Sequence, residues 1–393
     1  MGLTERLYYT DSTLREFRAH VIETAEGGCR VYLDRTAFYP ASGGQPHDTG
    51  TIAGAPVVEV VDEGDRIAHI TSVPVPTGEA DCRIDWPRRF DHMQQHSGQH
   101  LLSAVLVELY GAPTVSFHLG ADASAIDIAA ALTDAQLAAA EFRANEMVFE
   151  NRPVSVSFAD ASAAADLRKP SEREGTLRIV SIEDLDRSAC GGTHVRATGE
   201  IGPVLIRKLD RVRGNLRIEF LCGLRAVCRA RADYDALSRI AHVFSSSLDD
   251  APALAAAQAQ SLEAAEKARR KAAVELAQVR GRELYEATAP DAAGLRTAVE
   301  RVASAASDDE LRAKAQGFTA QGRACFIAVI ESARPAVLMA VSADAGVHAG
   351  NILKEAAGKL GGRGGGSAQM AQGSVGPGAA DDLVGALLGA LGR

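Results

Sequence analysis

The stretch DHMQQHSGQHLL at residues 91–102 carries the first half of a candidate metal site. His96 and His100 are four residues apart in a helical pattern, so both imidazoles leave the same face of the helix. About 90 residues later, Cys190 and His194 frame the glycine-rich turn CGGTH. Three imidazoles and one thiolate are ligands that zinc prefers, so the pattern predicts a zinc site that joins two distant segments.

The sequence leaves two questions about this site open. Two histidines on one helix face could instead pack against a sheet. Four protein ligands are typical of a closed, structural zinc site, whereas a catalytic site keeps a position for water. A cluster of carboxylates is absent from both halves, which argues against magnesium or calcium.

Composition narrows the class of protein. A chain of 393 residues predicts two or three domains. The net charge of −9 argues against a broad basic surface for nucleic acid, although it allows a local basic strip. No apolar run approaches the length of a membrane span, and the first residues lack a secretory signal. Six scattered cysteines are typical of a reducing cytoplasm, where Cys190 would be available as a thiolate.

The order of predicted elements indicates an α+β protein. Short apolar runs separated by turns predict a small β-barrel, and alternating strands around two helices predict a mainly antiparallel sheet. A long segment rich in Ala, Glu, Lys and Arg predicts a helical arm or coiled coil. We therefore expect four parts: a barrel domain over 1–89, a zinc-containing α/β domain over 90–235, a helical arm over 236–289 and a glycine-rich α/β domain over 290–393.

Two local predictions are specific enough to test. Asp91 is expected to cap the helix that carries the two histidines, because its carboxylate can accept from the free N–H groups of the first turn. The run GGRGGG at 361–366 is expected to be a loop. Such a loop could wrap a phosphate backbone through its N–H groups, or it could be a flexible linker.

Basic residues gather in two places that could contact RNA. The first cluster follows the second half of the metal site and is not balanced by acidic neighbours in the same way as the basic helical arm. The second surrounds the glycine-rich run. The candidates for RNA binding are Arg207, Lys208, Arg211, Arg213, Arg217, Lys354, Lys359, Gly361, Gly362, Arg363 and Gly364.

Taken together, these motifs resemble the freestanding alanyl-tRNA editing proteins in their long form, and the editing and C-terminal parts of alanyl-tRNA synthetase. The similarity runs in order along nearly the whole chain. The motifs that carry it are FYPASGGQPHDTG at 38–50, HSGQHLL at 96–102, SACGGTHV at 188–195, GNLRIEF at 214–220 and GGRGGG at 361–366.

The resemblance implies a hydrolase that cleaves the ester of tRNA(Ala) wrongly carrying serine or glycine. It implies a zinc ion held by His96, His100, Cys190 and His194, and a C-terminal domain that binds tRNA or supports a homodimer. Because the barrel begins almost at once, we expect no domain for charging tRNA.

The resemblance also suggests roles for residues around the zinc. Ser116 stands near the position that reads the serine hydroxyl, and a site built to hydrogen-bond a hydroxyl can reject alanine. Gln95 and Gln99 are candidates to orient water, and the turn residues Gly43, Gly44 and Gln45 could line the pocket. Neither half of the metal site contains a carboxylate base, so water would be activated by zinc or by the terminal ribose hydroxyl.

Three other functions compete with this one. A zinc-stabilised RNA-binding module would have a closed metal site and no turnover. A second alternative is editing of another aminoacyl-tRNA, because threonyl-tRNA synthetases carry a related editing fold. A metalloprotease or amidohydrolase is disfavoured, because no glutamate lies between the two histidines.

Overall fold

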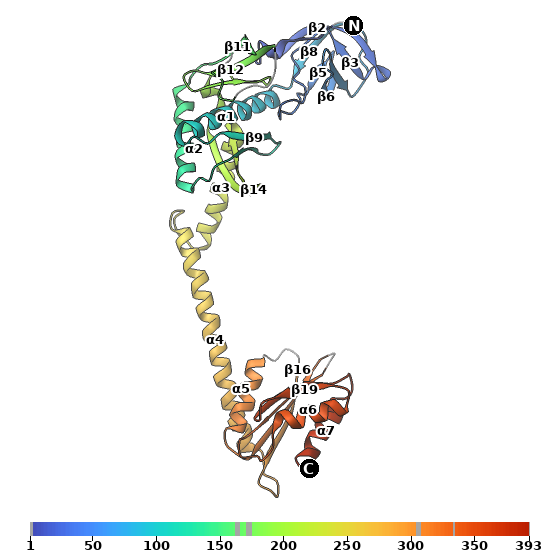
Figure 1. Ribbon diagram of the computed structural model, residues 1–393, viewed down its shortest axis with the longest axis vertical. Coiled ribbons are helices and arrows are strands. Elements are labelled where there is room, and N and C mark those ends of the chain that lie inside the picture. Colours follow the sequence, from blue (N-terminus) through green and yellow to red (C-terminus); the bar gives the residue numbers. More distant parts are fainter. Residues whose placement is uncertain (1–2, 162–165, 170–174, 304–307, 333–334, 393) are drawn as a thin grey trace. The chain divides into compact units, whose positions relative to one another are not determined.

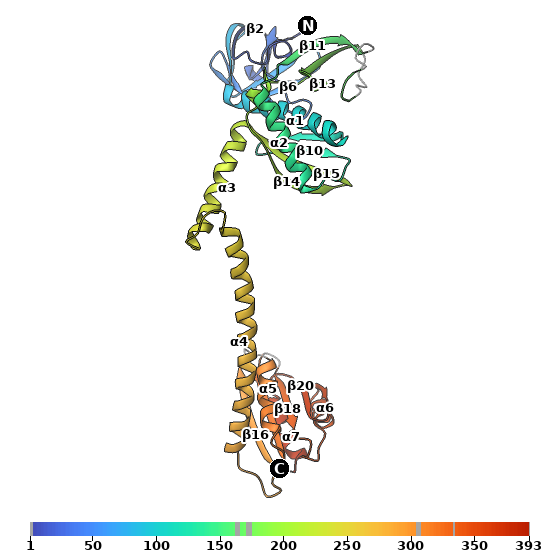
Figure 2. The ribbon, with the colours of Figure 1, turned by 90° about the vertical axis from the view of Figure 1, so that its left-hand side faces the viewer.

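The computed structural model describes residues 3–161, 166–169, 175–303, 308–332 and 335–392. The chain divides into two compact units, Met1–Ile240 and Ala241–Arg393, which Figures 1 and 2 display in two views. The mixed α+β class expected from the sequence is confirmed. Among the described residues, no helix is both long and apolar enough to cross a membrane.

The first unit begins with the predicted β-barrel, which is closed by six antiparallel strands. Alternating apolar residues such as Val31, Leu33 and Val57 fill its interior. A short parallel pair, β1 (Glu5–Arg6) and β4 (Arg35–Thr36), lies outside the barrel. In order around the barrel, the strands are β2 (Glu16–Ala25), β3 (Arg30–Leu33), β7 (Ile67–Thr71), β6 (Ala55–Asp62), β5 (Gly50–Ile52) and β8 (Gly78–Ile84).

Helix α1 (Trp86–Tyr110) follows the barrel and carries the first half of the metal site. It begins earlier than expected because Asp85, not Asp91, is its N-cap, and Pro87 occupies the first turn, where its missing N–H costs nothing. The prediction for Asp91 is therefore wrong. Asp91 is in the second turn of the helix, and its carboxylate accepts from Nε of Arg225 at 2.7 Å and from Nη2 of Arg225 at 2.6 Å.

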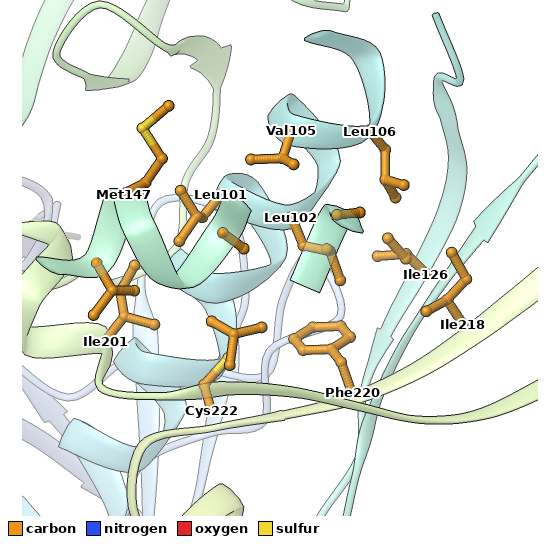
Figure 3. Packing of buried hydrophobic residues seen from close by; sticks show 14 of the residues in the cluster. Leu101, Leu102, Val105, Leu106, Ile126, Met147, Ile201, Ile218, Phe220 and Cys222 are labelled. Atoms are coloured by element: carbon orange, nitrogen blue, oxygen red, sulfur yellow. The ribbon is translucent and has the colours of Figure 1, made fainter. Parts of the chain in front are cut away.

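Two antiparallel sheets surround α1. The first packs α1 and α2 (Asp134–Glu150) against apolar residues such as Ile126, Ile218 and Phe220 (Figure 3). Its strand order is β14 (Val204–Val212), β15 (Asn215–Cys222), β10 (Ser124–Ile128) and β9 (Thr114–Leu119), so β9 is an edge strand. The second sheet contains β11 (Val154–Asp160), β12 (Thr176–Ile182) and β13 (Asp186–Ala189), and β13 leads directly into Cys190.

Helix α3 (Gly223–Val243) follows β15, and the predicted helical arm is helix α4 (Ala251–Ala287). A five-stranded sheet lies in the second unit, with helices α5 (Asp308–Thr319), α6 (Ala349–Lys359) and α7 (Ala380–Ala390). Its strands, in order, are β16 (Arg296–Ala303), β17 (Ala324–Glu331), β18 (Ala336–Val341), β20 (Met370–Ser374) and β19 (Arg363–Gly366).

The expectation of a loop over 361–366 is only partly right. Residues Arg363–Gly366 form the edge strand β19, which pairs with β20. The backbone of β20 lies too close for side chains at two positions: a Cβ would come within 2.3 Å of the Ser374 backbone oxygen at Gly362 and within 2.3 Å of the Met370 backbone oxygen at Gly366. The glycines therefore permit close backbone packing in this sheet.

Candidate metal centre

The four predicted ligands come together at one point. His96 and His100 project from α1, and Cys190 and His194 lie in the turn after β13; their ligand atoms all lie within 4.8 Å of one another. The Cys190 sulfur is 3.3 Å from Nε2 of His96 and 3.3 Å from Nε2 of His194. Tetrahedral coordination at usual Zn–S and Zn–N lengths separates sulfur and nitrogen by about 3.5 Å. These two distances are close to that value, and the four donors could together hold one metal ion.

Each imidazole is oriented by a hydrogen bond at its other nitrogen. The Nδ1 partners are Gln45 Oε1 for His96 at 2.8 Å, Asp186 Oδ2 for His100 at 2.9 Å and Ser97 Oγ for His194 at 3.2 Å. Such partners fix the ring and leave Nε2 for the metal. Gln45 was expected to line the pocket, but it is 1% exposed and supports His96 instead.

Asp186 joins the metal site to the connection between β11 and β12. Its other oxygen accepts from Nε of Arg168 at 2.6 Å. Burial by itself would lower the pKa of His100, but its hydrogen bonds to Asp186 and Cys190 raise that pKa to about 9. Burial opposes ionisation of Cys190, yet the surrounding imidazoles hold the pKa of its thiol well below the ordinary value. The site therefore favours a thiolate ligand.

The turn that carries Cys190 is held by Arg178, which the sequence argument missed. Its Nη1 donates to the oxygens of Cys190 at 2.7 Å and Gly192 at 2.9 Å, while Nε donates to the oxygen of Tyr9 at 2.9 Å. The only signal for this role was an arginine in an otherwise apolar strand. Asp186 was also missed, because nothing in the sequence pairs it with His100.

A cavity of about 830 Å³ opens onto this cluster. Of the residues expected around the metal from the sequence, Gly43, Gly44, Gln99 and Ser116 line this cavity. Gln95 is not in that wall. Its amide donates to the oxygen of Cys222 at 3.0 Å and accepts from the Cys222 N–H at 2.9 Å, so it cannot orient water there.

Gln99 lies between the two histidines in the sequence of α1, and a chain of two hydrogen-bonded hydroxyl groups orients its side-chain amide. Its Nε2 donates to Ser103 Oγ at 2.9 Å, and Ser103 Oγ is 2.6 Å from Thr114 Oγ1. One of the two N–H groups of the amide is thereby engaged. The amide oxygen is the atom left to accept a hydrogen bond from a molecule in the cavity.

Ser116 lies in a row of residues that crosses three strands. It pairs in register with Asp127 of β10, which pairs with Arg217 of β15. Ser116 Oγ donates to Asp127 at 2.7 Å, and Arg217 binds both oxygens of Asp127 at 2.7 and 2.8 Å. The hydroxyl proton of Ser116 is therefore committed. Arg217, expected to contact RNA, has its guanidinium engaged within the protein.

Comparisons with known proteins agree with the motifs. The model of the Threonyl and Alanyl tRNA synthetase second additional domain matches residues 177–219, and the DHHA1 domain matches residues 292–392. The chain is 36% identical over 242 residues to the alanyl-tRNA editing protein AlaX-L of Pyrococcus horikoshii, covering 58% of this chain and 60% of that protein. The chain is a homologue of the alanyl-tRNA editing proteins.

Other relatives extend the match. The alanyl-tRNA editing protein Aarsd1 of Bos taurus is 36% identical, over 55% of this chain and 54% of its own length. The alanine–tRNA ligase of Pyrococcus abyssi is 31% identical, over 95% of this chain and 42% of its own length. The chain thus spans little more than half the length of the curated editing proteins that it matches.

One solved structure, the C-Ala domain of Aquifex aeolicus alanyl-tRNA synthetase, aligns with 25% of this chain and 88% of its own, at 24% identity and a TM-score of 0.21.

The basic residues expected to bind RNA in such a homologue are partly neutralised. Arg207 pairs with Asp233, and Lys208 lies 2.8 Å from Asp210. Within the described residues of the first cluster, Arg211 and Arg213 remain as exposed cations with no carboxylate partner.

In the second unit, Lys359 pairs with Glu355 at 2.8 Å, while Lys354 and Arg363 are exposed. Gly361 is also exposed, whereas Gly362 and Gly364 are half-buried against neighbouring backbone. The cations free to meet RNA are thus fewer here than the sequence suggested.

Proposed function

We propose that this protein is a trans-editing hydrolase that removes serine or glycine from mischarged tRNA(Ala). The observation that carries the proposal is a buried four-donor cluster in the wall of a cavity of about 830 Å³, in a homologue of alanyl-tRNA editing proteins. A cavity of this size accommodates an aminoacyl group together with a nucleoside.

We propose zinc as the metal, held by His96, His100, Cys190 and His194. A thiolate with three imidazoles suits zinc better than hard cations such as magnesium or calcium. When bound, zinc would supply Lewis-acid polarisation of the substrate or of the attacking water. Its hydrogen-bonded ligands would keep that chemistry at the wall of the cavity.

Gln99 and Ser116 are the proposed substrate contacts. The Ser116 hydroxyl proton and one amide N–H of Gln99 are engaged within the protein, and each side chain keeps an oxygen able to accept from a hydroxyl or an ammonium group. A serine hydroxyl would satisfy such an acceptor, whereas alanine would leave it unpaired. We assign no side chain as general base, because Asp186, the carboxylate nearest the ligands, already binds His100 and Arg168.

For tRNA binding we propose the exposed cations Arg211, Arg213, Lys354 and Arg363. Few of them are available in a chain with a net charge of −9, so we expect binding to be weak and to fall steeply with salt. A substrate of this kind would place the activity in the cytoplasm. We propose that the second unit supports tRNA binding or a homodimer.

The test is the release of labelled serine from Ser-tRNA(Ala), with Ala-tRNA(Ala) as control, before and after removal of zinc by a chelator. We expect release of serine with alanine spared, loss of release on chelation and recovery on adding zinc. No release from either substrate, with zinc bound and tRNA retained, would favour a zinc-stabilised RNA-binding module. The four protein donors are compatible with that alternative.

A further inference from the structure

We infer that Phe117 sets the upper size limit for the aminoacyl group that this site accepts. The inference rests on the proposed function, because it assigns a substrate boundary to the same cavity. Phe117 is an aromatic residue in the wall of the cavity and stands beside a metal ligand. It did not figure among the candidates found from sequence.

The ring of Phe117 is held between α1 and the barrel. Its centroid is 5.9 Å from that of the His96 ring, with an angle of 34° between the planes. On its other side lies Gly44, where a Cβ would come within 3.0 Å of Phe117 Cε2. Gly44 also has φ of +80°, so both the space and the backbone favour glycine there. The phenyl ring fills the gap between the metal cluster and the Gly43–Gly44 turn.

The position of the ring is fixed by the strand that carries it. Phe117 pairs in register with the buried Ile126 and packs against the apolar core between the sheet and α1. The register shifts between Asp127 and Ile128, where Val115 is the extra residue on β9. Phe117 therefore faces α1. A half-buried ring packed in this way resists displacement by a ligand.

An aminoacyl group bound in the cavity beside His96 would meet this ring. A phenyl ring does not hydrogen-bond to the substrate side chain, so it would discriminate between amino acids by steric exclusion. It would tolerate the hydrogen of glycine and the hydroxymethyl group of serine and exclude bulkier side chains. Alanine is smaller than serine and passes such a limit, so its rejection must depend on an acceptor such as Gln99. Size and polarity would then be read by different residues.

The test compares deacylation of tRNA(Ala) carrying serine or threonine, which differ by one methyl group. We expect the wild-type protein to favour serine. Phe117→Ala should raise the threonine-to-serine ratio of kcat/KM by about 10-fold to 200-fold, the range that one methylene group contributes in an apolar pocket. The matched control is Phe158→Ala, because Phe158 also lines the cavity but is half exposed, and this variant should keep the wild-type ratio.

Metal content and thermal unfolding of every variant are measured in parallel. Should Phe117→Ala lose its metal or unfold, Phe117→Leu provides the smaller change and should shift the ratio in the same direction. A folded, metal-loaded Phe117→Leu or Phe117→Ala with the wild-type ratio would overturn the inference. Wild-type protein that releases neither amino acid would instead refute the proposed function.

Discussion

Gly192 is the residue of the CGGTH turn whose replacement tests the geometry of the metal centre most directly. A Cβ added there would lie 2.2 Å from Cε1 and 2.4 Å from Nδ1 of His96, and 2.9 Å from Oε1 of Gln45. Non-bonded carbon atoms are most favourably about 3.5 Å apart or more, so either the turn or the imidazole must move by roughly 1.3 Å. Both carry proposed metal ligands, so the displacement would act on the coordination sphere itself.

We expect Gly192→Ala to weaken zinc binding by at least about 100-fold. Loss of an outer partner of a ligand typically costs 10-fold to 100-fold in affinity, and here a ligand and its partner are both displaced. A 100-fold loss corresponds to about 2.8 kcal/mol of binding free energy. Competition with a chromophoric chelator measures the affinity, and thermal unfolding with and without zinc reports whether the fold survives.

The adjacent glycine supplies a matched control. A Cβ on Gly191 would find its nearest neighbour at Oη of Tyr9, 3.9 Å away, an ordinary contact. Gly191→Ala changes the same turn by the same methyl group and should retain wild-type affinity. Equal zinc affinities for the two variants would refute the claim that His96 leaves no room for a side chain at Gly192.

Three further predictions concern other parts of the molecule. Asp186→Asn keeps a hydrogen-bonding group beside His100 but removes its charge, and should lower zinc affinity by about 10-fold to 100-fold in the same competition assay. Burial lowers the pKa of His69 to about 4. As the pH falls from 6.5 to 4, His69 therefore becomes protonated in the unfolded chain but stays neutral in the folded barrel. The free energy of unfolding of the wild-type protein should fall by up to about 3 kcal/mol more than that of His69→Gln over this pH range. Urea unfolding at several pH values measures the difference. Gly317→Ala would bring a methyl group within 2.1 Å of the Gln278 oxygen on α4, and should cost about 1–3 kcal/mol of stability in denaturant titrations.

Each of these predictions has a control and a contrary outcome. Asp166→Asn removes an exposed carboxylate that pairs with Arg187, and zinc affinity equal to that of Asp186→Asn would contradict the role assigned to Asp186. An unchanged pH slope in His69→Gln would show that another group accounts for the acid sensitivity. Gly385→Ala meets open space, so equal stability losses for it and Gly317→Ala would argue against close packing of α4 and α5.

The sequence predicted features that depend on local pattern. Short apolar runs between turns identified the barrel, and the i, i+4 spacing of His96 and His100 identified the ligand face of α1. It failed where two local signals compete. Asp85 and Asp91 are both of a residue type that favours the N-cap, and the helix is capped by Asp85, with Pro87 in its first turn.

Side-chain contacts between residues far apart in the sequence could not be predicted from local pattern. The contact between His100 and Asp186 joins residues 86 positions apart, and no spacing rule links them. The ion pair of Arg217 was missed for the same reason, because counting charges along β14 and β15 could not show that this side chain meets Asp127 on β10. Register across a sheet, which fixes such pairs, is set by strands that come from separate parts of the chain.

The barrel and the loops that flank its strands are best understood as a part of the candidate metal centre. They supply Gln45 to His96 and the Tyr9 oxygen to the arginine that holds the cysteine turn. Asp48 of the barrel binds Arg89 of α1, and both side chains are completely buried. A buried ion pair adds little net stability, but breaking one leaves an unpaired charge, so it fixes the geometry between the parts it joins. The ligands on α1 and those in the CGGTH turn are thus aligned through a common contact with the barrel. This arrangement explains why the turn at 42–45 and the metal motif belong to one site although they lie far apart in the sequence.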